Sequence, residues 1–565
     1  MKPSQRHRKI IELLLQHGQV SVEQLVELLQ VSAVTVRNDL RSLEREEKLI
    51  RTRGGAAIGK LRGARANGAG SGDPSPEAFS SAQRIAQRAA AMVNEGDTIL
   101  LDSSPLTLAM LDYLAPLKML TVLTNSVFIA TTLAHNPTNR IMLLGGELQL
   151  DHDTLDGRFS MEALANLRIR KAFLACDGVT REQGVACDDL DRAKVKALFL
   201  SCASDIIMLA PAEAIGRAAL ISFASMGQVH HLITCSDVPA GLLADLRAAG
   251  VHVSLCGELL TQIQVDQPDG NKYRIAFANL NEQQEFAVTV RRSLEQAALA
   301  SGNIELIVAD NAADVRSALT IGRSLVDSQV DLVIEFQQDE HTNHVLMDMF
   351  RSASIPVIAV DIPMPGATFF GADNYRAGRI AGEAAVAWIR SRWQGQLDRL
   401  VCLEQRESGP MPQLRLQAQI DSLKEAGLLS EKSIVRCDTR GDLGGSQLAA
   451  TTALRNIPWG KRVLFMGINS NSALGSLAAA EALDRQPYTA VISQNATPRL
   501  RRELLRRNPM LIGAVDYFPR HYGEKIIQIA SAILAGRPVA PAIYTDHLLL
   551  TAENLNRIYP EDQLS

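Results

Sequence analysis

Short β-rich apolar runs alternate with helical patterns through two long stretches of this chain, residues 77–257 and 273–565. In the first stretch we predict strands at Thr98–Asp102, Leu120–Thr124, Arg140–Leu144, Ala172–Ala175, Asp205–Ala210 and His231–Thr234. In the second we predict them at Arg274–Ala278, Ile304–Val308, Asp331–Ile334, Pro356–Val360, Arg399–Leu403, Ile434–Cys437, Val463–Met466, Ala490–Gln494 and Leu511–Val515. Such alternation predicts an α/β fold whose mostly parallel sheets are covered by helices on both faces. Ligands of such folds bind at the carboxyl ends of the strands, where loops meet helix N-termini.

Two breaks in composition divide the chain. Residues 60–76 are dominated by Gly, Ala, Ser and Pro and carry no apolar period, so we predict a flexible linker there. Residues 258–272 contain the turn signal PDGN, which predicts a second linker. The 565 residues suffice for roughly three to five folding units. The breaks leave three blocks, residues 1–59, 77–257 and 273–565.

Composition excludes several classes of protein. With 46% apolar and 21% charged residues, the chain is neither largely disordered nor a collagen-like or coiled-coil rod. No run approaches the roughly 18 apolar residues that span a bilayer. Glu12 interrupts the apolar stretch of the basic N-terminus, which favours an amphipathic helix over a signal peptide, so we expect a cytoplasmic protein. The seven cysteines form no C-x-x-C pair, and we expect no metal site, disulfide or cofactor.

Positive charge is concentrated at the N-terminus. The whole chain has a net charge of −4, whereas residues 1–60 hold eleven Lys or Arg and seven Asp or Glu, a net charge of +4. This asymmetry favours an acidic partner for the first block.

The sequence of the first block predicts three helices and a short β-wing. In the third helix, residues 33–46, Val36, Leu40 and Leu43 have the i, i+4, i+7 spacing of one apolar face. The opposite, polar face suits the major groove, and arginines on a wing at residues 49–56 can neutralise phosphates. The residues that we expect to contact DNA are Ser32, Thr35, Arg37, Asn38, Arg41, Arg51 and Arg53. A three-helix packing module with a solvated charged face is the alternative that the charges alone leave open.

Residues 31–56 read VSAVTVRNDLRSLEREEKLIRTRGGA. This string resembles the DeoR-type winged helix-turn-helix, in which VS-x-x-T-[IV]-R-x-DL is followed by L-x-R-x-x-GGA. The resemblance implies binding to a double-stranded DNA operator. Asn38 stands where an arginine is usual. Because Asn favours adenine and Arg favours guanine, we expect this departure to change the base preference.

The second block carries a series of short motifs. They are Leu101-Asp102-Ser103, Thr124-Asn125-Ser126, Gly145-Gly146, Asp156-Gly157, Lys171-Ala172-Phe173-Leu174, Asp177-Gly178, Lys194 and Leu232-Ile233-Thr234. Together they resemble the DeoR-type sensor domain, which is similar in fold to Rossmann-like sugar-phosphate isomerases and CoA-transferase-like proteins. The resemblance implies a phosphosugar site in this block.

Two departures from the sensor pattern put that site in doubt. The family's Gly-Thr-Thr loop is replaced by Ser103–Thr107, in which Pro105 removes a backbone donor and Leu106 offers no hydroxyl. The family's Asp-x-Ser-Lys before a Gly-Arg is replaced by residues 210–217, in which an alanine stands in place of the lysine with the carboxylate of Glu213 beside it, so a phosphoester would lose a cation and meet a carboxylate. We therefore hypothesise that the block has lost or altered its phosphosugar site and acts in oligomerisation and coupling.

Four aspartates of the second block leave an enzymatic alternative open. Asp102, Asp177, Asp188 and Asp189 are possible acid or base groups. Aspartates at strand ends also cap helices, however, and the missing lysine and Gly-Thr-Thr loop disfavour an isomerase. We therefore do not expect an enzyme.

The third block resembles the type I periplasmic-binding-protein fold, which effector domains of lactose-repressor-type regulators share. The motifs are Ile355–Asp361 (IPVIAVD), Gly371–Gly378 (GADNYRAG), Gly467–Gly475 (GINSNSALG) and Phe518–Gly523 (FPRHYG). The resemblance implies two lobes with a cleft that binds a sugar or polyol. Amides and carboxylates bond hydroxyl groups, and aromatic rings cover C–H faces. The effector-binding residues that we expect are Gln284, Phe286, Asp361, Asp373, Asn374, Arg415, Asn469, Asn495, Asp516 and Tyr517.

The three blocks together predict a ligand-responsive transcription regulator. We expect a repressor of carbohydrate uptake or catabolic genes that acts as a dimer or tetramer on repeated half-sites, without contact to a membrane. Two alternatives stay open: an effector that binds the second block, and an isomerase-type enzyme with a regulatory head. Asn495 replaces an aspartate common at its position, so the identity of the sugar is open.

Overall fold

The computed structural model describes residues 76–565 except 150–153, 157–166, 248, 265–272, 561 and 563–565, together with residues 19–21, 25–26, 31, 35–36, 40, 50–52 and 55–57. Two compact units contain them. The first unit comprises Met1–Ser80, Asp97–Ala175 and Lys194–Ser204, and the second comprises Ser81–Gly96, Cys176–Ala193 and Asp205–Ser565. In the described part of the chain, no helix combines the length and the apolar character needed to cross a membrane.

The N-terminal block forms a small antiparallel sheet beside helical segments. Its strands, in the order β1-β3-β2, are β1 (Gln19–Ser21), β3 (Gly55–Ala57) and β2 (Ile50–Thr52). Residues 35–36 and 40 are helical, and Val36 and Leu40 are buried together with Leu25. The predicted wing is therefore present, and the apolar face of the third helix is buried where it is described.

The rest of the first unit is a parallel sheet in the order β9-β4-β5-β6. Its strands are β4 (Thr98–Leu101), β5 (Thr121–Thr124), β6 (Arg140–Leu143) and β9 (Ile169–Ala175). The helices α5 (Pro105–Ala109), α6 (Leu111–Leu114) and α7 (Val127–Ala134) connect them. A hairpin of β7 (Glu147–Gln149) and β8 (Thr154–Asp156) follows.

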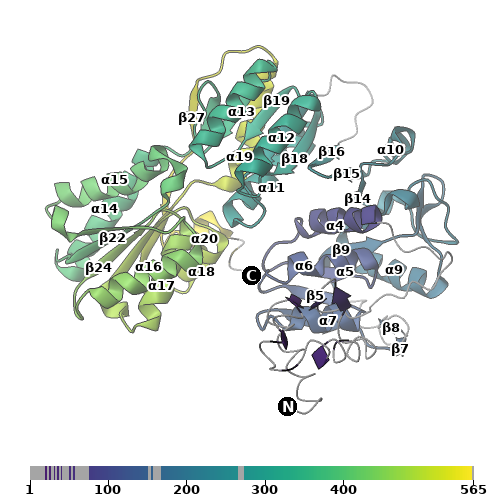
Figure 1. Ribbon diagram of the computed structural model, residues 1–565, viewed down its shortest axis with the longest axis horizontal. Coiled ribbons are helices and arrows are strands. Elements are labelled where there is room, and N and C mark those ends of the chain that lie inside the picture. Colours follow the sequence, from purple (N-terminus) through teal and green to yellow (C-terminus); the bar gives the residue numbers. More distant parts are fainter. Residues whose placement is uncertain are drawn as a thin grey trace. The chain divides into compact units, whose positions relative to one another are not determined.

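Ten strands of the second unit form one sheet, in the order β27-β21-β20-β19-β17-β18-β16-β15-β14-β12 (Figure 1). They are β12 (Ala203–Leu209), β14 (His231–Cys235), β15 (His252–Cys256), β16 (Leu260–Gln264), β17 (Tyr273–Asn279), β18 (Ile304–Asp310), β19 (Leu332–Glu335), β20 (Val357–Val360), β21 (Thr368–Gly371) and β27 (Ala542–Tyr544). Strand β16 pairs antiparallel with both β15 and β18. The predicted linker at 258–272 is thus partly a strand, and its last eight residues lie outside the described residues.

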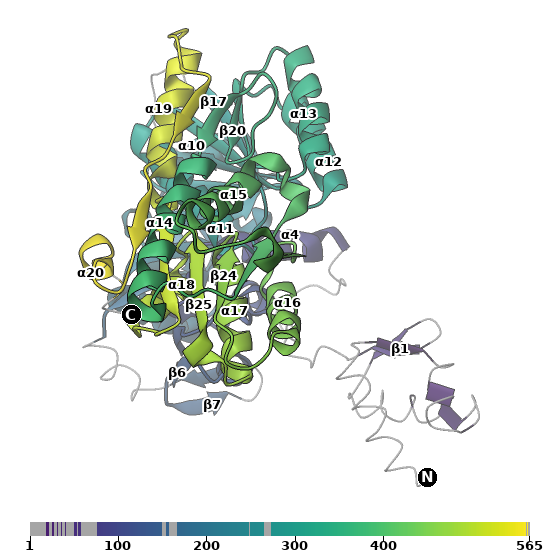
Figure 2. The same ribbon diagram turned by 90° about the vertical axis from the view of Figure 1, so that its left-hand side faces the viewer.

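We call the part of this sheet from β17 to β21, with β18, β27 and their helices, the N-lobe. Its helices are α11 (Glu285–Ser301), α12 (Val315–Asp327), α13 (Glu340–Ser352) and α19 (Tyr522–Leu534). Figure 2 shows α12 and α13 on one side of β17 and β20 and α19 on the other. Its strands other than β27 are buried along most of their length, as expected for a sheet covered on both faces.

The C-lobe is a six-stranded sheet in the order β23-β22-β24-β25-β26-β28. Its strands are β22 (Arg399–Glu404), β23 (Ile434–Asp438), β24 (Val463–Gly467), β25 (Thr489–Gln494), β26 (Leu511–Asp516) and β28 (Leu548–Leu550). Its helices are α14 (Asn374–Trp393), α15 (Pro410–Glu425), α16 (Leu443–Asn456), α17 (Ser470–Ala482), α18 (Pro498–Leu505) and α20 (Leu555–Ile558). The chain passes between the lobes after β21, after β26 and after β27, which confirms the predicted bilobal α/β architecture.

Candidate functional site

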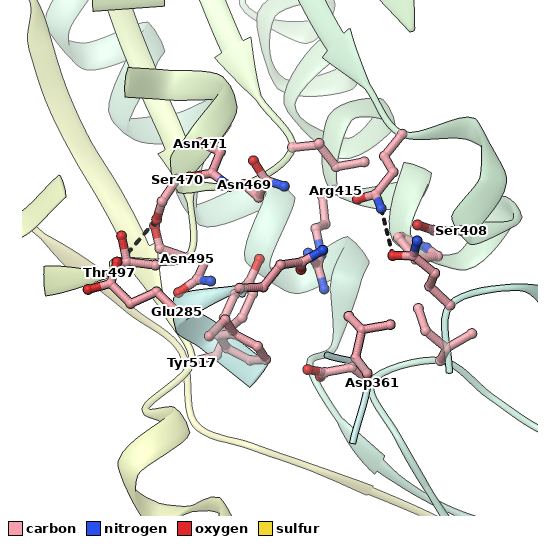
Figure 3. A pocket seen from close by; sticks show the side chains of 18 of the residues that line it. Glu285, Asp361, Ser408, Arg415, Asn469, Ser470, Asn471, Asn495, Thr497 and Tyr517 are labelled. Atoms are coloured by element: carbon pink, nitrogen blue, oxygen red, sulfur yellow. Dashed lines mark hydrogen bonds between the residues drawn. The ribbon is translucent and has the colours of Figure 1, made fainter. Parts of the chain in front are cut away.

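Polar loops at the carboxyl ends of strands in both lobes enclose a cleft. Its empty volume, open to solvent, is about 780 Å³. It is lined by Leu280, Gln284, Glu285, Phe286, Phe336, Gln338, Asp361, Ile362, Gln405, Ser408, Pro412, Arg415, Ile468, Asn469, Ser470, Asn471, Asn495, Thr497 and Tyr517. Figure 3 shows Asn469 and Asn495 on one side, Asp361 on the other and Arg415 between them. The lining combines amides, carboxylates, hydroxyls, one guanidinium and aromatic rings, a set suited to a polyhydroxylated ligand.

Asp361 supplies the N-lobe's carboxylate at the end of β20. Its backbone is left-handed, with φ +59°, a conformation that is uncommon for residues other than Gly, Asn and Asp. Tyr522 Oη and the amide of Ala372 donate to its Oδ1 at 3.1 and 3.2 Å. Burial raises the pKa of Asp361, and the guanidinium of Arg415 opposes that rise. A strained, anchored carboxylate of this kind is typical of a functional position.

Asn495 and Asn469 supply amides from the C-lobe. Asn495 directly follows β25 with φ +67° and is only 7% exposed, and its Oδ1 has no hydrogen-bond partner within the described part of the chain. Asn469 caps α17, since its Oδ1 accepts from Ser472 N at 2.9 Å while its Nδ2 donates to Gly441 O at 2.9 Å. The buried acceptor of Asn495 can therefore take a hydrogen bond from a ligand hydroxyl.

Arg415 is held in place from two sides. Its Nε donates to Asn374 Oδ1 at 2.5 Å, and its guanidinium carbon lies 4.9 Å from the centre of the Tyr517 ring. The Tyr517 hydroxyl in turn donates to Gln494 Oε1 at 2.6 Å. The Tyr517 ring and the hydrogen bond to the Asn374 side chain fix the plane of the guanidinium. Its remaining N–H groups are left to donate to a ligand oxygen in the cleft.

Seven of the ten expected effector residues line the cleft: Gln284, Phe286, Asp361, Arg415, Asn469, Asn495 and Tyr517. Three do not. Asp373 caps α14 by accepting from Arg376 N at 3.0 Å, and Asn374 holds Arg415. Asp516 accepts from Tyr559 Oη and Phe518 N, because side chains alternate along β26 and Tyr517 takes the direction of the cleft.

Several lining residues are ones that sequence reasoning missed. Gln338 and Gln405 follow β19 and β22, and Gln405 Nε2 donates to Gln338 Oε1 at 3.0 Å between the lobes. Ser470 Oγ accepts from Thr497 N at 3.1 Å and donates to Asn495 O at 3.0 Å. Gln338, Gln405, Ser470 and Thr497 all follow the carboxyl ends of strands. The expectation that ligands bind at these ends would have predicted all four, had we applied it to every strand.

A second polar cluster lies in the first unit, at the end of β4. Lys196 Nζ bonds Asp102 Oδ2 and Ala175 O, and all of these groups are buried. Thr107 Oγ1 donates to Asp102 Oδ1 at 2.8 Å. Burial alone would raise the pKa of Asp102, but the Lys196 ammonium and the hydrogen bonds hold it below its usual range. The cation of this cluster is Lys196, which sequence reasoning missed; Lys194, which it named, is exposed.

Three of the four aspartates that raised the enzymatic alternative are in ion pairs. In the second unit, Asp188 Oδ2 lies 2.7 Å from Arg217 Nη2, and Asp177 lies 3.4 Å from Arg192. Arg217 Nη1 also donates to Asp177 O at 2.6 Å. In the first unit Asp102 is bound to Lys196, so ion pairs account for three of the four carboxylates.

The expected DNA contacts fall mostly outside the described residues. Thr35 lies in a helical segment and Arg51 in β2. Ser32, Arg37, Asn38, Arg41 and Arg53 lie outside the described residues.

Family models match three consecutive parts of the chain. A DeoR-like helix-turn-helix domain matches residues 6–61, a DeoR C terminal sensor domain residues 79–236, and a periplasmic binding protein domain residues 275–538. The HTH-type transcriptional repressor GlcR of Bacillus subtilis (strain 168) is 31% identical over 234 residues, 41% of this chain and 89% of that protein. The chain belongs to the DeoR family of transcriptional regulators. These matches confirm the family resemblances stated for the three blocks.

Other relatives of this DeoR-family regulator also align with less than half of it. The HTH-type transcriptional regulator GolR of Listeria innocua serovar 6a is 28% identical over 45% of this chain and 99% of that protein. The glycerol-3-phosphate regulon repressor of Escherichia coli (strain K12) is 27% identical over 45% of this chain and all of that protein. Among solved structures, an ABC transporter solute binding protein from Actinobacillus succinogenes 130z with bound D-allose is 17% identical, with a TM-score of 0.44 over 51% of this chain and 100% of that one.

Proposed function

We propose that this DeoR-family regulator represses genes for carbohydrate uptake or catabolism, and that a sugar or polyol bound in the cleft controls it. The cleft carries the proposal. Two lobes meet there with a carboxylate at Asp361, a guanidinium at Arg415 and a buried, unpartnered amide oxygen at Asn495. Hydroxyl pairs are the ligand groups that this set of donors and acceptors recognises.

Aromatic side chains complete the chemistry of a sugar site. Phe286 and Tyr517 line the cleft, and Phe286 packs edge-on against Phe336 with ring centres 6.2 Å apart. Rings of this kind cover the apolar C–H faces of a pyranose or a cyclic polyol. The combination favours a neutral, unphosphorylated effector.

The DNA-binding and assembly parts of the proposal rest on the N-terminal block. A single winged helix-turn-helix makes few base contacts, so we propose a homodimer or homotetramer on a double-stranded operator with repeated half-sites. We propose that the regulator works in the cytoplasm, where its operator would lie. Effector binding must differ between the DNA-bound and released states, because otherwise it could not shift their populations.

A thermal-shift screen of the full chain tests the effector. The panel pairs unphosphorylated sugars and polyols with their phosphate esters. A ligand that binds the folded cleft raises the unfolding midpoint by mass action. We expect a neutral member to stabilise the wild type and to have no effect on Asp361→Ala. Stabilisation by phosphate esters alone, unaffected by Asp361→Ala, would contradict the proposal.

An effector site near Asp102 is the second candidate. The buried Lys196 ammonium beside Asp102 favours it, since a phosphoester could replace the carboxylate as its partner. The neutralisation of Lys196 by Asp102 disfavours it. Calorimetric titration of sugar phosphates into the wild type and Lys196→Met separates the two candidates, because only this second site requires Lys196.

A further inference from the structure

A segment of eight residues, formed by the last turn of helix α4 (Pro76–Ala90) and the residues after it, contacts both lobes that enclose the cleft. We call this segment, Arg88–Glu95, the strap. It lies within the stretch that the sensor-domain model matches, yet its polar contacts are to helices of the periplasmic-binding-protein-like domain.

The N-lobe holds the strap through helix α11. Arg88 makes a two-fold ion pair with Glu295, at 2.8 and 3.1 Å. Arg291 and Arg292 donate to the carbonyl of Ala91 at 3.0 and 2.7 Å, and Arg292 Nη2 also donates to Val93 O at 2.7 Å. Arg291 is itself buried and paired with Glu295 at 2.6 Å. Burial and several charge-assisted bonds make this a firm anchor.

The C-lobe meets the strap through helix α18. Arg502 Nη2 lies 2.9 Å from Glu95 Oε2, and the two side chains are 23% and 19% exposed. This ion pair is more hydrated than the buried pair of Arg88 and Glu295, whose side chains are 10% and 11% exposed. A solvated single pair is easier to break than a buried network.

The sheet fixes which lobe can move against the strap. Because β16 pairs with both β15 and β18, hydrogen bonds run without a break from β12 to the N-lobe strands. The C-lobe has its own sheet and is joined to the N-lobe by crossing segments of the chain. Ligands close such two-lobed domains by hinge rotation of one lobe against the other. Rotation of the C-lobe against the N-lobe would therefore alter the contact of the strap with α18 and leave its contacts with α11 in place.

Both helices that the strap touches begin at the cleft. Helix α11 starts at Glu285 and α18 follows Thr497, and both residues line the cleft. Burial raises the pKa of Glu285, the charge of Glu95 adds to the rise, and a hydrogen bond from Thr497 opposes it.

We infer that the strap reports closure of the cleft to the rest of the regulator, and that the ion pair of Glu95 with Arg502 is the contact that closure makes or breaks. Glu95 and Arg502 are positioning residues for the response and do not bind the effector. The inference rests on the proposed function, because it requires an effector in the cleft.

The test uses the full chain and the member of the neutral sugar and polyol panel that stabilises it most. DNA affinity is measured with and without that compound, on a DNA fragment selected from random sequence by the wild type. We expect the compound to change the affinity of the wild type fivefold or more, as couplings of this kind do. We expect Glu95→Gln and Arg502→Gln to reduce the change to less than twofold while the compound still raises their unfolding midpoints.

Two further variants make the result specific. The charge swap that combines Glu95→Arg with Arg502→Glu should restore the response to the compound. Arg506→Gln, which removes an exposed ion pair with Glu503 on the same helix, should respond like the wild type. If both single variants respond to the compound as strongly as the wild type does, the inferred role of the strap is wrong, while the proposed function still stands. A panel without any stabilising member overturns the proposed function and this inference with it.

Discussion

Tyr522, at the start of α19, donates a hydrogen bond from its hydroxyl to Asp361 Oδ1 at 3.1 Å, although 161 residues separate the two in sequence. Both are buried, and the Tyr522 ring packs edge-on against Phe370 with centres 4.9 Å apart. The tyrosine thereby fixes the direction of the carboxylate that the N-lobe offers to a ligand. Such a fixed group loses little freedom when the ligand binds.

Tyr522→Phe tests this orientation. The change removes one hydrogen bond to a buried carboxylate and leaves the packing in place, which costs about 1–3 kcal/mol. We expect the affinity for the neutral effector to fall roughly tenfold, since 1.4 kcal/mol corresponds to a factor of ten. Calorimetric titration measures it. Unchanged affinity would mean that the hydroxyl has no part in presenting Asp361.

Gly378→Ala tests the packing that places Arg415. A Cβ at Gly378 would meet the Arg415 carbonyl and lie 2.7 Å from the Ala418 Cβ, where α14 crosses α15. Overpacking of this kind costs about 1–3 kcal/mol and moves the backbone. We expect lower stability in chemical unfolding followed by tryptophan fluorescence, and weaker effector binding. Gly444→Ala is the control, because its nearest contact would lie at 3.6 Å; equal losses in both variants would contradict the prediction.

Glu335 should make the third block less stable as the pH rises. It is buried with Asn311 Nδ2 at 2.8 Å, and burial raises its pKa to about 8. The folded state therefore keeps a proton that the unfolded state loses above about pH 4.3. Stability falls between that pH and about 8. A single such group contributes a slope of about 1.4 kcal/mol per pH unit.

Glu335→Gln should remove this slope, because the amide has no ionised form. The three tryptophans, Trp388, Trp393 and Trp459, all lie in residues 273–565, so the fluorescence-detected urea midpoint reports on that block. We expect the gain of the variant over the wild type to increase towards the alkaline end of the window. A constant difference across the window would show that Glu335 is not protonated in the folded state.

Arg37→Ala tests the DNA-binding block. We predict Arg37 in the polar part of the third helix, whose Val36 and Leu40 are buried. Loss of a base-contacting arginine weakens specific binding by about 1–3 kcal/mol and relaxes specificity at its position. Binding to the selected DNA and to random DNA should be compared, and an equal loss on both would indicate a phosphate contact instead.

Sequence patterns predicted the alternating α/β units well, because most predicted strands are apolar runs that are buried along most of their length, with β6 and β23 as the exceptions. They also predicted the positions of Asp361 and Asn495, since both follow a buried strand. They could not separate Asp516 from Tyr517, because which of two neighbouring residues faces the cleft depends on the register of β26. We did not predict strand β16, because it precedes a turn signal in a stretch that we read as a linker. No local sequence pattern predicts the contact of Glu95 with Arg502, because 407 residues separate them.

The most direct test of the central claim is the DNA affinity of the full chain with and without its stabilising sugar or polyol, in the wild type and in Asp361→Ala. If the cleft controls the DNA-binding block, the compound changes the affinity of the wild type at least fivefold, and Asp361→Ala binds DNA as the free wild type does but no longer responds. A compound that binds the wild type through Asp361 and leaves its DNA affinity unchanged would contradict the account.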